Sequence, residues 1–250
     1  MDPRTSVIGK RLEKVKRIIA VSGGKGGVGK SVISSLLALA LSESGKKVGL
    51  LDLDLSSPSD HIILGVKNLY PEEEYGIIPP EFQGIRFMSI TLFAKDEPTP
   101  LRGDDVSNAI RELLCITRWE DLDFLIIDMP PGIGDELFEA IELLKRCEFI
   151  LVTIPSRVAF ETVKKLALIL REIKSPIIGV IENMKRGEND FILKECERLN
   201  LDYLGSVRFD EKLEDAIGDS EKIKESKVFE DILRISRFLM EGQRDLSRCT

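Results

Sequence analysis

Histidine and cysteine are scarce in this chain of 250 residues. There is one histidine, His61, and the four cysteines form no CxxC pair. These counts exclude a histidine-rich zinc enzyme, a zinc ribbon built from local cysteine pairs, and a Ser-His-Asp hydrolase assembled on any histidine other than His61. A disulfide scaffold is not expected at this length, and free thiols in a reducing compartment are the default. We interpret His61 as a helix-surface residue. The cysteines are Cys115, Cys147, Cys196 and Cys249.

Long apolar runs and net positive charge are also missing. No run approaches the roughly 18 uncharged apolar residues of a membrane span, and no apolar stretch with a cleavage site follows the basic N-terminus. The 36 Lys and Arg residues are outnumbered by 43 Asp and Glu residues, which gives a net charge of −7. Bulk nucleic-acid binding needs a basic surface. We therefore expect a cytoplasmic protein with neither a nucleic acid nor a membrane as partner.

Short Ile/Leu/Val-rich runs alternate with helix-like stretches along most of the chain. Near-continuous apolar strands between helices are typical of a mostly parallel sheet covered on both faces. Right-handed crossovers then predict an α/β fold with a doubly wound sheet. The predicted strands are 18–22, 48–53, 85–90, 124–127, 149–154 and 177–181, and the predicted helices are 31–44, 106–117, 136–145, 160–173 and 190–199.

A basic leader, residues 1–16, precedes a single predicted domain that spans residues 17–250. Ile8, Leu12 and Val15 fall at i, i+4 and i+7, which is one helical stripe. Two interpretations stay open. The stripe packs on the chain's own core, or it is a docking helix for a groove on a partner protein.

The strongest motif is GGKGGVGKS at 23–31, between a predicted strand and a predicted helix. It contains G-x-x-x-x-G-K-[ST], the phosphate loop. Glycines let backbone N–H groups turn toward phosphate oxygens, and the following helix adds the positive end of its dipole. Lys30 is expected to contact the β- and γ-phosphates, and Ser31 to supply an oxygen to Mg²⁺. The predicted nucleotide-binding residues of this loop are Gly24, Lys25, Gly26, Gly27, Val28, Gly29, Lys30 and Ser31.

Acidic residues follow two other predicted strands. Asp128 ends an apolar run, as in sites where a buried strand directs a carboxylate at the metal's water shell. Gly132 is expected to bring its backbone N–H close to the γ-phosphate in a segment able to switch. Asp52 and Asp54 lie two residues apart, so both side chains can face the same side of the chain. Asp52 is a candidate for supporting the metal shell.

Lys25 lies inside the loop, where a generic phosphate loop needs no lysine. The pattern K-G-G-x-G-K-[ST] resembles the deviant Walker A ATPases, a group that includes MinD, Soj/ParA, the nitrogenase iron protein and the Mrp family. The resemblance implies an ATP hydrolase that binds ATP or ADP with Mg²⁺ and forms a homodimer on ATP binding, with Lys25 reaching the partner's nucleotide. It also implies that Asp54 orients or activates the attacking water and that Asn183 recognises adenine. The implied catalytic residues are Lys25, Lys30 and Asp54, and the implied metal residues are Ser31, Asp54 and Asp128.

Three further stretches resemble Mrp-type proteins in particular. They are D-x-D-x-x-x-P-S followed by L-G-V at 52–66, R-G…W-x-x-L-D-x-L-x-I-D-x-P-P-G-x-G-D at 102–135, and I-E-N-M at 181–184. Iron–sulfur carriers of this type follow I-E-N-M with C-x-x-C, whereas K-R-G-E-N-D follows here and only Cys196 is nearby. A cluster needs several thiolates, so an iron–sulfur carrier is kept as an alternative.

An Mrp-like chain without the cysteine pair and with a basic leader resembles the archaeal ATPase form of the hydrogenase maturation protein HypB. This resemblance implies nickel insertion into NiFe hydrogenase together with a HypA-type nickel metallochaperone. A further alternative is a MinD-like membrane-positioning ATPase, whose anchor would be the apolar and basic segment 229–244.

Overall fold

The structure is a computed structural model that describes residues 2–94 and 104–241. The R-G match at 102–103, Cys249 and the end of the segment 229–244 lie outside the described residues. The chain position of every site residue predicted above falls within them.

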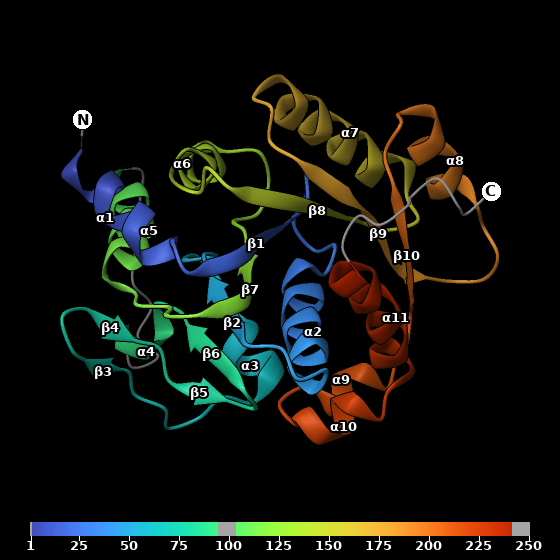
Figure 1. Cartoon of the computed structure of the whole chain (residues 1–250). Coiled ribbons are helices and arrows are strands. Elements are labelled where there is room, and N and C mark those ends of the chain that lie inside the picture. The colour runs from blue at the N-terminus through green and yellow to red at the C-terminus, as the bar shows by residue number, and fades with distance from the viewer. Residues whose placement is uncertain (1, 95–103, 242–250) are drawn as a thin grey trace.

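An eight-stranded sheet forms the centre of the molecule, in the order β10-β9-β8-β1-β7-β2-β6-β5 (Figure 1). Seven strands are parallel, and the edge strand β5 is antiparallel to β6. The predicted doubly wound α/β fold is therefore confirmed. The strands are β1 (Val15–Ser22), β2 (Val48–Asp52), β5 (Glu81–Phe82), β6 (Ile85–Met88), β7 (Leu122–Asp128), β8 (Cys147–Thr153), β9 (Ile177–Lys185) and β10 (Tyr203–Arg208), and β3 (Glu72–Glu73) pairs separately with β4 (Ile77–Ile78).

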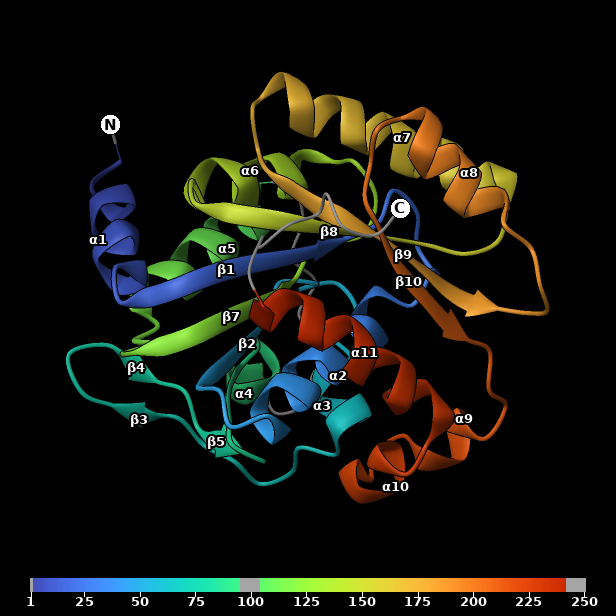
Figure 2. The same ribbon diagram turned by 45° about the vertical axis from the view of Figure 1, so that its right-hand side comes forward.

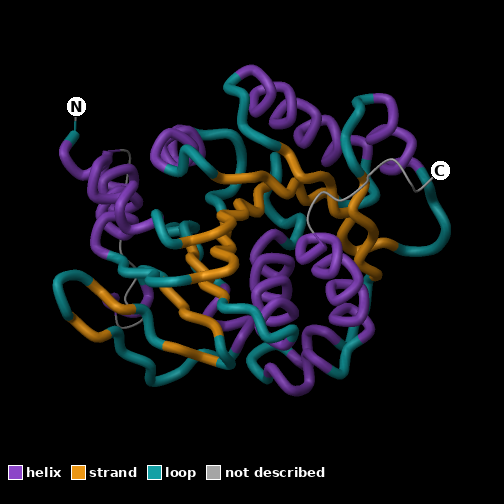
Figure 3. Tube along the Cα trace, viewed as in Figure 1, coloured by secondary structure: helices purple, strands orange, loops and turns teal. Residues whose placement is uncertain are grey.

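Helices cover both faces of the sheet, and each face has its own apolar core (Figures 2 and 3). The inner strands are buried on both sides, which is why they read as near-continuous apolar runs. One face carries α1 (Pro3–Leu12), α5 (Asp104–Ile116), α6 (Asp135–Leu143), α7 (Arg157–Glu172) and α8 (Phe191–Arg198), and the other carries α2 (Lys30–Glu43), α3 (Asp60–Leu64), α9 (Leu213–Ala216), α10 (Ser220–Lys224) and α11 (Lys227–Glu241), while α4 (Thr91–Ala94) follows β6.

Four strands are not predicted from the sequence: β10 and β5 at the edges of the main sheet, and the separate pair β3 and β4. β10 is a half-buried edge strand in which only Leu204 and Val207 are buried, and it includes Gly205 at φ +136°. β5 has only two residues. None of these four strands has the continuous apolar run that marks a strand buried on both faces, so the pattern is too weak to predict them.

The apolar stripe of the leader is buried within the chain itself. Ile8 and Leu12 of α1 are 0% and 4% exposed, and α1 packs against α5. Two ion pairs add to this contact, from Arg111 of α5 to Asp2 at 3.0 Å and from Arg4 of α1 to Glu112 of α5 at 3.8 Å. A partner groove therefore has no free stripe to cover in this structure, and the domain boundary at residue 17 stays a prediction.

The segment considered as a membrane anchor is largely part of the core. α11 buries Phe229, Ile232, Ile235 and Leu239 against α2 and the sheet, and Phe238 is half exposed. No helix in residues 2–94 and 104–241 has both the length and the apolar character that a membrane crossing requires.

We predict that Ile8→Ala lowers the free energy of unfolding by about 2–5 kcal/mol, because it leaves a cavity between α1 and α5. Val7→Ala on the same helix removes methyl groups from a side chain that is 37% exposed and should cost less than about 1 kcal/mol. Denaturant unfolding of both variants measures the difference. Equal, small losses would mean that α1 is not part of the folded core.

Candidate nucleotide-binding site

The phosphate loop joins the end of β1 to the start of α2. Gly27 and Gly29 have φ values of +78° and +82°, a left-handed conformation that favours glycine. Gly29 is the N-cap of α2, and no side chain caps the first turn of that helix. The N–H groups of this turn are therefore available to an anion at the positive end of a 14-residue helix.

Two other parts of the chain, α7 and β9, lie in close contact with the loop. A Cβ added to Gly24 would lie 2.5 Å from the backbone of Thr162 in α7. A Cβ added to Gly29 would lie 2.2 Å from Nδ2 of Asn183, at the end of β9. Both positions therefore need glycine for packing, and the loop is held between α7 and β9.

The two lysines of the loop differ in environment. Lys30, in the first turn of α2, is 6% exposed, and its charge bears on the nearby Asp128. Lys25 is exposed, and it has no hydrogen bond or ion pair to any residue that the structure describes. Lys25 can therefore reach outward, whereas Lys30 belongs to the interior of the site.

Asp128 ends β7 and is fully buried beside α2. Its Oδ2 accepts a hydrogen bond from Ser31 Oγ at 2.6 Å, and its Oδ1 accepts one from Ser34 Oγ at 3.0 Å. Burial raises the pKa of Asp128 to about 6, although Lys30 and the two serine hydroxyls oppose that shift. Ser31 and Asp128, which the sequence predicts to serve the same metal ion, are therefore adjacent in the structure.

Asp52 and Asp60 lie next to Asp128, and all three are fully buried. One oxygen of each lies within 4.8 Å of one oxygen of each of the others. Burial raises the pKa of Asp52 and of Asp60 well above the ordinary range, and the charge of the neighbouring Asp128 raises both further. Asp52 Oδ1 accepts from the backbone N–H of Asp54 at 3.0 Å, and Asp60 Oδ1 accepts from Ser35 Oγ at 2.8 Å.

Asp54 lies at the edge of this cluster and is 7% exposed. Its Oδ1 is bound within its own loop, by Ser56 Oγ at 2.7 Å and the N–H of Ser57 at 3.1 Å. One carboxylate oxygen thus holds the loop in place, and Oδ2 is left for a further contact. Gly132, between β7 and α6, has φ +83°, and no atom would lie within 4 Å of a Cβ placed there. Its backbone conformation, not crowding, therefore requires glycine.

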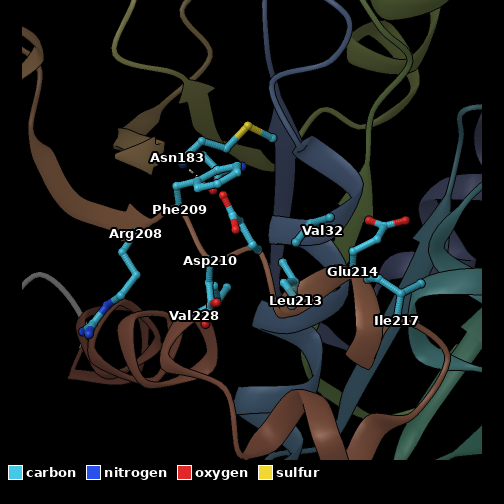
Figure 4. Close-up of a pocket in the computed structure, with 11 residues that line it drawn as sticks. Val32, Asn183, Arg208, Phe209, Asp210, Leu213, Glu214, Ile217 and Val228 are labelled. Carbon is cyan, nitrogen blue, oxygen red and sulfur yellow. Dashed lines mark hydrogen bonds between the residues drawn. The ribbon is translucent and has the colours of Figure 1, made fainter. Parts of the chain in front are cut away.

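Asn183 is 4% exposed and connects the loop to a pocket. Its Nδ2 donates to the carbonyl of Val28 at 2.9 Å, and its Oδ1 accepts from the N–H of Met184 at 2.9 Å. One amide hydrogen and one lone pair remain for a base. Figure 4 shows Asn183 and Phe209 at one end of the pocket, with Glu214 at the other. The pocket has a volume of about 360 Å³ and is lined by Val32, Asn183, Met184, Arg208, Phe209, Asp210, Glu211, Leu213, Glu214, Ile217 and Val228.

Sequence reasoning missed three polar residues of this site. Ser34 and Ser35 are buried in a helix that is otherwise rich in Leu and Ala, and that contrast was a usable signal. Asp60 was not predicted, because a carboxylate at the start of a short helix is most often an exposed cap. Only the packing of α3 against α2 brings it to Asp128.

We predict that Asp60→Asn stabilises the metal-free, nucleotide-free protein at pH 8. The raised pKa of Asp60 means that the folded chain keeps a proton which the unfolded chain has already lost above pH 4. The free energy of unfolding of the wild-type protein therefore falls as the pH rises from the unfolded-state pKa of Asp60 toward its folded-state pKa. The Asp60→Asn variant has no proton to lose at this position and is spared that part of the loss. Each kcal/mol recovered should raise the melting temperature by about 2–4 °C.

Calorimetry at pH 4 and pH 8 measures the effect, with Asp202→Asn at an exposed position as the control. The difference between wild type and Asp60→Asn should shrink toward zero at pH 4. A variant that is less stable than the wild type at pH 8 would contradict the assignment.

A glycine loop between a strand and a helix, with Lys30, Ser31 and the buried Asp128, defines the class of phosphate-loop nucleotide-binding proteins. The chain belongs to the ParA family, whose model is described as NUBPL iron-transfer P-loop NTPase and matches residues 14–237.

Curated relatives are named iron–sulfur cluster carrier proteins. One from Methanocaldococcus jannaschii is 38% identical over 229 residues, which cover 84% of this chain and 78% of that protein. One from Aquifex aeolicus is 42% identical over 179 residues, which cover 70% of this chain and only 49% of that protein. The predicted resemblance to Mrp and MinD proteins is therefore confirmed.

Solved structures share the fold over nearly the whole chain. A nucleotide-binding protein from Archaeoglobus fulgidus, in complex with ADP, superposes with a TM-score of 0.72 at 27% identity, covering 94% of this chain and 93% of that one. The cell division ATPase MinD from Pyrococcus furiosus has a TM-score of 0.69 at 22% identity, with 91% and 99% covered, and supports the fold alone.

The predicted role in nickel insertion, with HypB as the model and a HypA-type metallochaperone as partner, is wrong. The relatives at 38–42% identity are iron–sulfur proteins by name. The prediction depended on a missing cysteine pair and on the character of the leader. A missing motif points to no particular metal, and the apolar stripe of the leader is part of the core.

Proposed function

We propose that this chain is a Mg²⁺-dependent ATPase that works as a nucleotide-switched homodimer in iron–sulfur cluster assembly, in the cytoplasm. The observation that carries the ATPase part is the contact of Ser31 with Asp128, 2.6 Å apart at the mouth of the phosphate loop. The family and the names of its relatives support the iron–sulfur part.

The residues at the loop fit Mg²⁺ and a nucleotide phosphate. Asp128 accepts the Ser31 hydroxyl hydrogen, so the serine oxygen keeps lone pairs for a cation. Mg²⁺, when bound, would neutralise charge on the β- and γ-phosphates. Lys30 adds a buried positive charge, and the uncapped first turn of α2 adds N–H donors. These groups are preorganised for the charge that develops during phosphoryl transfer.

Asp54 is the proposed residue that orients the attacking water. Its Oδ2 is free of the hydrogen bonds that bind Oδ1 to Ser56 and Ser57. The loop that positions Asp54 starts directly after β2, beside Asp128, so a change at the γ-phosphate would reach it over a short distance. Lys25 is proposed to act across a two-fold interface, where each protomer's exposed lysine meets the other's nucleotide.

We predict that Lys30→Ala abolishes Mg·ATP binding, since it removes a buried charge that faces the phosphates. Asp54→Asn should keep ATP binding but slow hydrolysis by about 10²-fold or more, the usual loss when a group that positions a reactant is removed. Because this variant does not consume ATP, it should accumulate as a dimer. Isothermal titration, phosphate release and light scattering measure the three quantities.

Lys25→Ala in the Asp54→Asn background is the control for the dimer. It should bind ADP normally yet remain a monomer with ATP, because an exposed lysine contributes to the interface and not to the fold. A dimer of unchanged strength would reject the role of Lys25, and normal turnover in Asp54→Asn would reject that of Asp54.

The environment of the cysteines bears on whether this chain can hold an iron–sulfur cluster itself. Burial raises the pKa of both Cys147 and Cys196 to about 12, and it raises the pKa of Cys115 above its ordinary value. Iron is bound by thiolates, so these three cysteines are poorly suited as cluster ligands. We therefore propose that the cluster thiolates come from a partner protein and that this chain supplies the ATP-dependent step.

We predict that the chain restores the activity of an iron–sulfur enzyme in cells that lack their own carrier of this family. Restoration should depend on the nucleotide site and fail with Lys30→Ala. Restoration should persist with Cys196→Ser, because Cys196 is buried and is not a proposed cluster ligand. Enzyme assays on cell extracts, at matched expression of the three proteins, measure the outcome.

Two results would count against this proposal. Failure of the wild type to restore the enzyme would reject the role in iron–sulfur assembly. Loss of restoration with Cys196→Ser, together with a cluster absorbance on anaerobic reconstitution of the wild type alone, would show that the chain binds a cluster itself.

A further inference from the structure

Glu182, in the I-E-N-M motif, is a fully buried acid to which the site described above gives no role. Its Oε2 accepts a hydrogen bond from the Tyr203 hydroxyl at 2.7 Å and lies 3.1 Å from Nζ of Lys185, whose side chain is 18% exposed. Replacing a buried ion pair by apolar residues is often neutral or stabilising. Stability alone therefore does not explain why the chain places this pair at the end of β9.

The ion pair depends on an irregularity in β9. In a regular strand, residues three apart point to opposite faces of the sheet. β9 has two residues, Asn183 and Met184, where the neighbouring β10 has one, Val207. This β-bulge returns Lys185 to the face of Glu182, so that their side chains can meet. Bulges often lie next to active sites, where they change the direction of a side chain.

The bulge directs two consecutive side chains to the same space. Asn183 and Met184 both line the pocket, although neighbouring residues of a regular strand face opposite sides of the sheet. Met184 has φ +55°, a left-handed conformation that is uncommon for residues other than glycine. Such a conformation persists only where the surrounding structure holds it in place.

Lys185 also holds another part of the pocket wall. Its carbonyl accepts a hydrogen bond from the N–H of Phe209 at 3.0 Å. The guanidinium of Arg186 lies over the Phe209 ring, 3.8 Å from the ring centroid. Phe209 and Asn183 lie together at one end of the pocket (Figure 4). Through Lys185, the buried carboxylate of Glu182 is therefore connected to both sides of that end.

We infer that Glu182 and Lys185 are positioning residues, whose ion pair holds the bulge of β9 so that Asn183, Met184 and Phe209 enclose a nucleotide base. The inference rests on the nucleotide site proposed above, and it gives neither Glu182 nor Lys185 a contact with the nucleotide. Any effect on the phosphate loop, through the bond from Asn183 to the carbonyl of Val28, would weaken ADP and pyrophosphate alike. The ratio of the two affinities therefore reports the base alone.

Isothermal titration with ADP and with pyrophosphate, both in the presence of Mg²⁺, measures this ratio. The wild type should prefer ADP. Lys185→Met should reduce the preference about tenfold, which is about 1.4 kcal/mol and the order of one buried hydrogen bond. Lys185→Arg keeps the positive charge and should retain most of the preference. Lys194→Met, at an exposed position of α8, is the matched control and should leave the ratio unchanged.

Lys185→Met leaves a buried carboxylate without its cation, so the double variant with Glu182→Gln is made as well. It removes both charges, keeps an acceptor for Tyr203, and decides the question if the single variant does not fold. An unchanged ratio in a folded variant would overturn the inference, and so would a loss in Lys185→Arg as large as that in Lys185→Met. Failure of the wild type to bind ADP would reject the proposed nucleotide site and this inference together.

Discussion

The burial of Asp128 constrains the arrangement around it. A carboxylate taken out of water costs several kcal/mol unless it is hydrogen-bonded or paired with a charge. Here the hydroxyls of Ser31 and Ser34 meet its two oxygens, and Lys30 faces it from the first turn of α2. Those contacts fix the rotation of α2 over β7. This requirement explains Ser31 and Ser34 in a helix that is rich in Leu and Ala.

The position of α2 in turn determines the shape of the loop before it. The loop must turn left-handed at Gly27 and Gly29 to reach the helix, and it passes within contact distance of α7 and Asn183. Asn183 then links the loop to the pocket, since its amide donates to the carbonyl of Val28 and the residue also lines the pocket. The phosphate and base positions proposed for this site are therefore joined through one side chain.

The central part of this arrangement could be predicted because its signals are local. A strand buried on both faces is an apolar run, and the phosphate loop is contiguous in sequence. Asp60 could not be predicted, since its position depends on how α3 packs beside Asp128. The stripe of α1 was ambiguous for a physical reason: a helix that docks on a partner and one that docks on its own chain have the same pattern. β10 was not predicted, because an edge strand is only half buried and has no continuous apolar run.

The nickel assignment was wrong because it depended on a motif that is absent. The motifs that resemble Mrp-type proteins lie around the phosphate loop, at Asp52, Asp128 and Asn183, whereas the C-x-x-C expected after I-E-N-M is missing. The missing pair removes one way of holding a cluster and leaves the proposed nucleotide site intact. Cys147 and Cys196 are buried, and burial raises the pKa of each to about 12, so both are poorly suited to replace the pair. The chain is therefore expected to differ from cluster-binding members of the family in the source of the thiolates, as proposed above, while it keeps the phosphate loop that defines the class.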